Sequence, residues 1–198
     1  MTKRTLKPLL TLLGSLILSA APLSGMRDAP ATGVEFSIFH PLQLHTPETS
    51  VEGVRFNVFY AKNASLRGLD LSIFGVGHFT EPSAGLMLNF LGSVSEDEFT
   101  GFQTGLVTYS KVSFVGVKGG ALNLSKGEMV GWQTGWVSIG NGRVKGLQTG
   151  LVNYAEDMNG VQFGLVNVAK RLKGVQIGLG NVNQSGPLVF FPFVNAAF

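Results

Sequence analysis

The sequence contains no cysteine among its 198 residues, and only 14% of its residues are charged. Without cysteine the chain can form no disulfide bond, and it has no thiolate nucleophile or metal ligand. Its three histidines, His40, His45 and His78, are scattered, whereas a metal site needs several ligands at close and regular spacing. We therefore assign the histidines to loops and expect no metal.

Sequence motifs of catalysis are also missing. No serine stands in a G-x-S-x-G turn, and the stretches "GVGHF" (75–79) and "GVKGG" (116–120) lack the Lys-Ser/Thr pair of a phosphate-binding loop. The carboxylates of "SEDE" (95–98) are adjacent, which favours a solvated loop over a weak surface calcium site. We expect no enzyme activity, no catalytic residues and no cofactor.

The net charge of +3 originates at the N-terminus. Lys3, Arg4 and Lys7 precede the uncharged run "PLLTLLGSLILSAAPL", which is the pattern of a secretory signal peptide. We assign residues 1–25 to it, with cleavage between about Ala20 and Gly25; an uncleaved membrane anchor is the alternative. Setting these three basic residues aside leaves 12 basic against 12 acidic residues, so charge does not favour nucleic-acid binding.

Glycine is abundant, with 27 residues, and much of it follows a repeat. Segments such as "GFQTGLVTY" (from Gly101) and "GLQTGLVNY" (from Gly146) recur every 14 or 15 residues. In each copy Gln or Lys stands third, a second glycine fifth, and Thr, Ser or Asn eighth. The structural repeat positions are Gly101, Gln103, Gly105, Gly116, Gly120, Asn123, Gly131, Gln133, Gly135, Gly146, Gln148, Gly150, Asn153, Gly160, Gln162, Gly164, Asn167, Gly174, Gln176, Gly178 and Asn181.

Each copy predicts a β-strand rather than a helix. Valine, leucine and aromatic residues dominate, and each glycine inside a helix would cost about 1 kcal/mol relative to alanine. Charges fall in short connectors, and weaker copies begin at Gly53, Gly68 and Gly85. We therefore predict an all-β chain with a lead-in segment (26–52), a β-repeat domain (53–183) and a terminal apolar strand (184–198).

Two all-β architectures fit this repeat. We favour an antiparallel meander that closes into a barrel-like sheet of about ten short strands, because the uncharged tracts have the length of outer-membrane strands. The alternative is a parallel β-solenoid with coils of 14–15 residues, in which Gln and Asn would stack in ladders. The ending "VFFPFV" would be a poor water-facing cap for a solenoid.

The copies "GLQTGLVNYA" and "GVQFGLVNVA", and the ending "FFPFVNAAF", resemble a bacterial surface-repeat family that was first labelled from a Leptospira locus. The likeness covers about residues 34 to 198. This resemblance implies an exported envelope or surface protein with no assigned activity and no catalytic residues.

We expect an exported, non-enzymatic envelope or surface protein with a structural or interaction role, associated with the outer membrane. The alternatives are a secreted or surface-displayed adhesin or glycan-binding module, in which the Gln row and Trp132 and Trp136 would meet a sugar, and a small pore. Membrane or other cell-envelope components are the expected partners, a glycan or host-surface ligand is the alternative partner, and no nucleic acid is expected. The sequence leaves the oligomeric state open.

Overall fold

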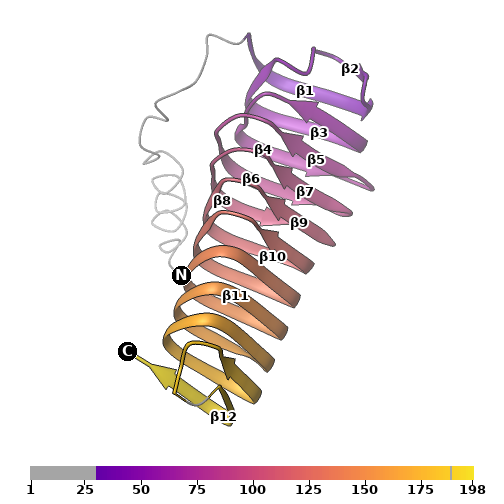
Figure 1. Cartoon of the computed structure of the whole chain (residues 1–198). Helices are drawn as coiled ribbons and strands as arrows, with labels where there is room; N and C mark the ends of the chain where they lie inside the picture. The colour runs from indigo at the N-terminus through magenta and orange to yellow at the C-terminus, as the bar shows by residue number, and fades with distance from the viewer. Residues whose placement is uncertain (1–29, 188) are drawn as a thin grey trace, which may run out of the picture.

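The computed structural model of the chain describes residues 30–187 and 189–198, so the predicted signal peptide lies outside the described residues. The described chain winds into a β-solenoid in which each coil lies on the one before it (Figure 1). In these two ranges no helix is long and apolar enough to span a membrane.

The strands, in chain order, form one twelve-stranded sheet that follows the solenoid. They are β1 (Ala31–Phe39), β2 (Leu42–Gln43), β3 (Ser50–Asn63), β4 (Arg67–Ser72), β5 (Val76–Phe79), β6 (Ser83–Asn89), β7 (Gly92–Ser95), β8 (Phe99–Thr104), β9 (Val107–Ser110), β10 (Ser113–Ser125), β11 (Glu128–Asn183) and β12 (Phe190–Ala197).

Successive coils pair in parallel, and each residue pairs with the residue at the equivalent position of the neighbouring copy. Gly116 pairs with Gly101 of the preceding coil and with Gly131 of the following coil, and Leu124 pairs in the same way with Tyr109 and Ile139. The coils contain two strand segments each: β4, β6 and β8 stack on one another as the first segment, and β5, β7 and β9 stack as the second. β3 and β10 each span both segments of a coil, and β11 continues through the last coils without interruption.

The barrel-like antiparallel meander that we predicted is therefore wrong, and the alternative, a parallel β-solenoid with coils of about 15 residues, is the observed fold. Within the described ranges the antiparallel pairings are confined to the two ends, between β1 and β2 and between β11 and β12. The physical reason is the repeat itself. Parallel stacking places the same residue type above itself, so the side-chain amides of neighbouring coils can pair.

The apolar ending is the cap that we judged unfavourable for a solenoid. β12 pairs with the last coil of β11, from Ala197 beside Gly174 to Phe190 beside Val182. The side chains of Phe190 and Phe193 stay exposed. Pro192 lies in the middle of β12 and has no N–H to offer a further strand, which makes this free edge a poor template for pairing.

The apolar core is a narrow column inside the coils. It includes Phe99, Phe114 and Met129, each two residues before the first glycine of its copy and each fully buried. The rings of Phe99 and Phe114 stack with their centroids 5.6 Å apart. The rest of the interior is polar, which is unusual because buried positions normally select apolar residues.

Candidate functional site

The first glycine of each regular copy lies in one column along the solenoid, in a backbone conformation that other residues rarely adopt. In the six regular copies its φ lies between +125° and +141°. A Cβ atom there would lie 1.9–2.2 Å from the carbonyl oxygen of the glycine in the preceding coil. Only glycine permits this approach. The column comprises Gly101, Gly116, Gly131, Gly146, Gly160 and Gly174 and continues upstream through Gly85, Gly68, Gly53 and Gly33.

The second glycine of each copy lies at a corner of the coil, between the two strand segments. From Gly120 to Gly178, a Cβ atom there would lie 1.8–2.3 Å from the carbonyl oxygen of the second glycine of the preceding copy. At Gly105 a Cβ atom would instead lie 2.8 Å from the Cα atom of Gly92. Because the chain turns at this corner, the third and eighth residues of a copy both point inward although they are five positions apart. The positions concerned are Gly105, Gly120, Gly135, Gly150, Gly164 and Gly178.

The glutamines at the third position form a buried hydrogen-bonded ladder. Gln176 Nε2 donates to Gln162 Oε1 at 2.8 Å, and Gln162 Nε2 donates to Gln148 Oε1 at 2.7 Å. Gln148 Nε2 then donates to Gln133 Oε1 at 3.0 Å. All of these side chains, and that of Gln103, are fully buried. The ladder satisfies the amides along the solenoid axis and always donates toward the N-terminal coil.

The asparagines at the eighth position form a second buried ladder that runs in the opposite direction. Asn153 Nδ2 donates to Asn167 Oδ1 at 2.8 Å, and Asn167 Nδ2 donates to Asn181 Oδ1 at 2.9 Å. Asn123 Oδ1 accepts from the hydroxyl of Thr108 at 2.6 Å. Each ladder therefore serves the packing of coils, and the two sets of amide dipoles point in opposite directions.

Each ladder is interrupted once by a residue that is not an amide, and an unpaired buried atom marks the place. Lys118 occupies a glutamine position, and Gln133 Nε2 in the next coil has no hydrogen-bond partner. Ser138 occupies an asparagine position, and Asn153 Oδ1 in the next coil has no partner. An unsatisfied buried polar atom costs roughly 1–3 kcal/mol, so both places lower the stability of the fold.

Replacing Ser138 with asparagine is expected to raise the free energy of unfolding by about 1 kcal/mol. The new Nδ2 would donate to the unpaired Asn153 Oδ1, as Asn153 does to Asn167. The midpoint of urea unfolding measures the change. Ser138→Ala is the control, because it leaves Asn153 Oδ1 unpaired. Equal stability in the two variants would contradict the ladder.

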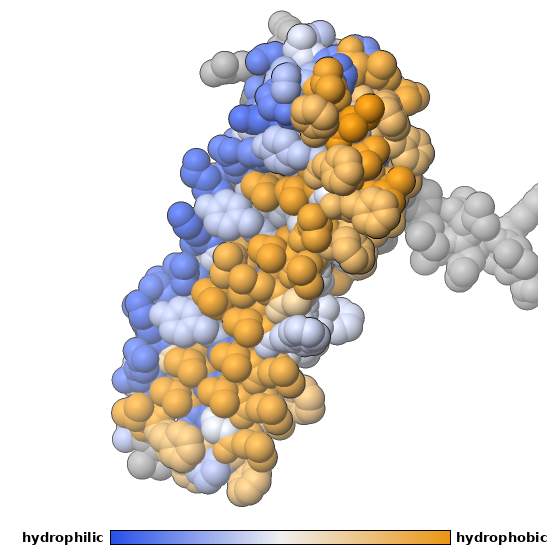
Figure 2. Space-filling view, turned by 90° about the vertical axis from the view of Figure 1, so that its right-hand side faces the viewer, coloured by the Kyte–Doolittle hydropathy of each residue, from blue (hydrophilic) through white to orange (hydrophobic). Residues whose placement is uncertain are grey.

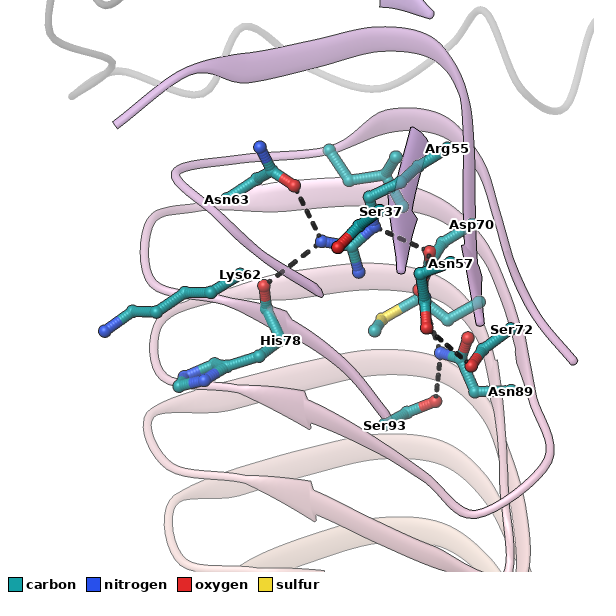
Figure 3. A network of polar contacts seen from close by, with 12 residues as sticks. Ser37, Arg55, Asn57, Lys62, Asn63, Asp70, Ser72, His78, Asn89 and Ser93 are labelled. Atoms are coloured by element: carbon teal, nitrogen blue, oxygen red, sulfur yellow. Dashed lines mark hydrogen bonds and ion pairs between the residues drawn. The ribbon is translucent and has the colours of Figure 1, made fainter. Parts of the chain in front are cut away.

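The N-terminal coils replace the amide ladder by a buried ion pair. Arg55 and Asp70 occupy the third position of their copies, and Arg55 Nε donates to Asp70 Oδ1 at 2.7 Å with both side chains fully buried (Figure 3). Asn63 Oδ1 accepts from Arg55 Nη1 at 3.0 Å, and Asn89 Nδ2 donates to Asp70 Oδ2 at 2.9 Å. Gly77 leaves the space for the pair, since a Cβ there would lie 2.1 Å from Asp70 Oδ2.

Our sequence analysis missed this cluster. The signal was present, because opposite charges stand at the third position of two successive weak copies, "GVRFNVF" and "GLDLSIF". In an inward-facing column such charges must pair, since an isolated charge in the interior is strongly disfavoured. Arg55 also lies over the ring of Phe79, at 3.9 Å from its centroid. We assign the cluster to packing of the coils.

A chain of titratable side chains crosses the outside of the first coils. Tyr60 Oη lies 2.8 Å from His78 Nδ1, and His78 Nε2 lies 2.8 Å from Glu96 Oε1. This order resembles a nucleophile, a base and an orienting acid. Burial, however, raises the pKa of Tyr60, which disfavours the phenolate, and burial lowers the pKa of His78. The pocket lined by Arg143 and Asp157 and the pocket lined by Asn183 and Phe191 both lie away from these residues.

The remaining histidines do not form a metal centre. His45 Nδ1 pairs with the buried carboxylate of Glu35 at 2.7 Å, and His40 lies edge-on to Tyr60. Among residues 30–187 and 189–198, no three His, Asp or Glu side chains are grouped as metal ligands. The carboxylate of Glu96, in the "SEDE" loop, is shared by His78 and Lys111.

The fully buried glutamine ladder cannot form the sugar-binding row that we considered from the sequence, although Trp132 and Trp136 are exposed. The same buried side chains fill the interior of the coils.

No protein family, no curated protein and no solved structure matches this chain.

Proposed function

We propose that the chain is an exported, non-enzymatic protein of the bacterial envelope or cell surface, whose role is structural or one of surface interaction. One observation supports this most directly. The polar groups of the repeat are buried and bonded to one another, while the strand faces turned to the outside are largely apolar. Such a molecule offers an extended surface for a partner, and the one chain of reactive groups noted above, Tyr60, His78 and Glu96, lies outside the described pockets.

The signal-peptide pattern and the resemblance to surface-repeat proteins support the same proposal from the sequence side. An exported chain with apolar outer faces would meet envelope membranes or envelope proteins first. Because monomeric soluble proteins rarely expose large contiguous apolar patches, the outer faces favour permanent association with such a partner.

The test is fractionation of the cells that naturally produce the protein. We expect it to sediment with the envelope and to stay there in high salt, because apolar contacts do not weaken with ionic strength as exposed charge contacts do. A subsequent alkaline carbonate wash separates tight from loose association. Recovery in the cytosol or only in the culture medium would contradict an envelope protein.

The second candidate is a secreted or displayed adhesin that binds a glycan or a host surface. The supporting observation is the exposure of Trp132 and Trp136, with 67% of Trp136 accessible. Their exposed indole rings offer flat surfaces on which sugar rings could stack, and this contact does not need the glutamine side chains, which are buried. Recovery in the medium, together with glycan binding that is lost in Trp136→Ala, would favour this candidate over an envelope protein.

A further inference from the structure

Beyond the stacked glycine, the first segment of each coil presents an uncharged outer face. The side chain that follows each stacked glycine points outward, and Leu69, Leu86, Phe102, Val117 and Trp132 lie in one row. A second row, two residues further along the chain, includes Leu71, Leu88 and Thr104. We call these rows the first face, and no charged residue belongs to them from Val34 to Ile177.

The second segment adds another apolar face, which joins the first face at a corner. Its outer row begins with Lys62 and His78 but continues with Val94, Tyr109 and Leu124 and is uncharged from Val94 onward. At the corner, which we call the ridge, most coils carry one large apolar side chain that is half-exposed or more, and Ala121 takes this position in the coil between Leu106 and Trp136. These residues include Ile73, Phe90, Leu106, Trp136, Leu151 and Leu165.

Most exposed charges lie elsewhere, in and beside the turns that close each coil. There they form ion pairs between neighbouring coils, such as Lys145 with Glu128 and Lys170 with Glu156. Figure 2 shows a hydrophobic band that runs the length of the solenoid beside a hydrophilic edge. The solenoid is therefore amphipathic around its axis, with an ion-paired polar edge and two apolar faces on which Lys62 and His78, in the first coils, are the exceptions.

The size and shape of this surface argue against a second copy as its cover. The nine glycine stacking steps from Gly33 to Gly174 span about 43 Å at the usual strand spacing, and a face of roughly four residues is about 13 Å wide. One face thus has a projected area of about 560 Å², so a second copy would have to cover both faces to bury comfortably the roughly 800 Å² per partner of a stable interface. A rigid copy that packs on one side of a convex ridge leaves the other side exposed.

A lipid surface can cover both faces at once because it deforms around the ridge. The backbone groups of the faces are already bonded between coils, so they can enter an apolar phase without unpaired N–H or C=O groups. Trp136 stands on the ridge, Trp132 on the first face and Tyr109 on the second face, and aromatic residues of these types favour the membrane–water interface.

We infer that the ridge and its two faces bind a phospholipid surface directly, with the ridge among the upper acyl chains and the charged turns in water. Interfacial amphipathic elements typically bury their apolar side by about 5–10 Å. The inference rests on the proposed envelope location and deepens it, since an envelope protein could instead be attached through another protein.

The two native tryptophans report on this contact, because Trp132 lies on the first face, Trp136 lies on the ridge, and the chain contains two tryptophans in all. The full chain, as purified from an exporting host, is mixed with phosphatidylcholine vesicles whose acyl chains carry bromine. We expect a blue shift and quenching of the fluorescence. The comparison of Trp132→Phe with Trp136→Phe should show stronger quenching of Trp136 than of Trp132.

Matched variants separate the ridge from the rest of the chain, including its N-terminal segment. Leu106→Asp with Leu151→Asp places two carboxylates on exposed ridge positions three coils apart. Asn141→Asp with Gln184→Glu adds the same charge at exposed turn positions. The ridge pair should weaken vesicle binding more than ten-fold, because a carboxylate is expelled from the acyl region. The turn pair should bind as the unchanged chain does, and thermal unfolding shows that both variants fold.

Equal binding by the ridge pair and the turn pair, or no quenching by the brominated chains, would overturn the inference. So would a dimer in sedimentation without lipid that the ridge pair converts to a monomer, since the cover would then be a second copy. If the natural cells still retain the protein in their envelope fraction in such a case, the proposed function stands and attachment proceeds through a protein contact.

Discussion

Lys118→Gln is expected to stabilise the protein by about 3 kcal/mol at pH 7. Burial lowers the pKa of Lys118 to about 7, because desolvation penalises the charged ammonium group. The group donates to three acceptors, Ser110 Oγ, Ser125 Oγ and the carbonyl oxygen of Leu124. A glutamine would remove this desolvation cost. It would also accept from the unpaired Gln133 Nε2 and donate toward Gln103, which joins the two parts of the ladder.

The gain should depend on pH in a defined direction. In the unfolded chain Lys118 stays protonated up to its ordinary pKa of 10.5, but in the folded chain it does so only up to about 7. The unfolded state therefore binds more protons between these values, so the stability of the unchanged protein rises with pH across this window. Glutamine does not titrate, so the advantage of the variant is largest below pH 7 and shrinks toward pH 10.5.

Urea unfolding of both proteins from pH 6 to pH 10 measures this difference, and groups common to both chains cancel. Lys126→Gln is the matched control, because Lys126 is exposed in the turn that follows the same coil. It should change the stability by less than about 0.5 kcal/mol at any pH. A Lys118→Gln variant that is less stable than the unchanged chain at pH 7 would show that the amide ladder does not extend through this coil.

Gly116→Ala is expected to lower the free energy of unfolding by roughly 3–5 kcal/mol. The φ of Gly116 is +134°, which alanine rarely adopts, and a Cβ would lie 1.9 Å from the carbonyl oxygen of Gly101. The coil must move away from its neighbour, which breaks parallel backbone hydrogen bonds between β8 and β10. Because each coil contacts only its neighbours, we expect hydrogen exchange to rise first at this junction.

Gly119→Ala provides the control within the same coil. At this outward position a Cβ would meet only the methyl groups of Thr134 and Thr104, at 3.7 Å and 3.9 Å. Thermal unfolding should therefore leave Gly119→Ala within about 0.5 kcal/mol of the unchanged chain. Similar losses in both variants would mean that general β-propensity, and not the stacked glycine, determines the effect.

The repeat identified the β-strand units but not the way they pair. A copy of 14 or 15 residues suits an antiparallel strand with its turn as well as one solenoid coil, because length and alternation are the same in both. A solenoid must leave one apolar side of each strand outside, and the side chains of Phe163 and Leu165 are indeed exposed. The expectation that apolar residues lie inside failed here because the amides, and not the leucines, can pair with their own kind between coils.

The buried charges illustrate a second limit. Arg55 and Asp70 share the third position with the glutamines, so the sequence indicated their place in the copy. Their side chains meet only because the coils stack with the same phase and because Gly77 leaves room beside them. The chain of Tyr60, His78 and Glu96 arises in the same way, from residues 18 positions apart that register alone brings together.

By itself, the sequence determined that the chain is an all-β repeat protein, because the composition and period of the copies exclude a helix. Only the tertiary structure decided which faces are inside. Parallel stacking with equivalent residues paired turns the third and eighth residues inward, where amides bond amides. Apart from the buried column of Phe99, Phe114 and Met129, it leaves many apolar residues of both segments on the outer faces. The alternation of side chains along a strand does not predict which residues face inward, because the corner at the second glycine brings the third and eighth residues to the same, inner side of the coil.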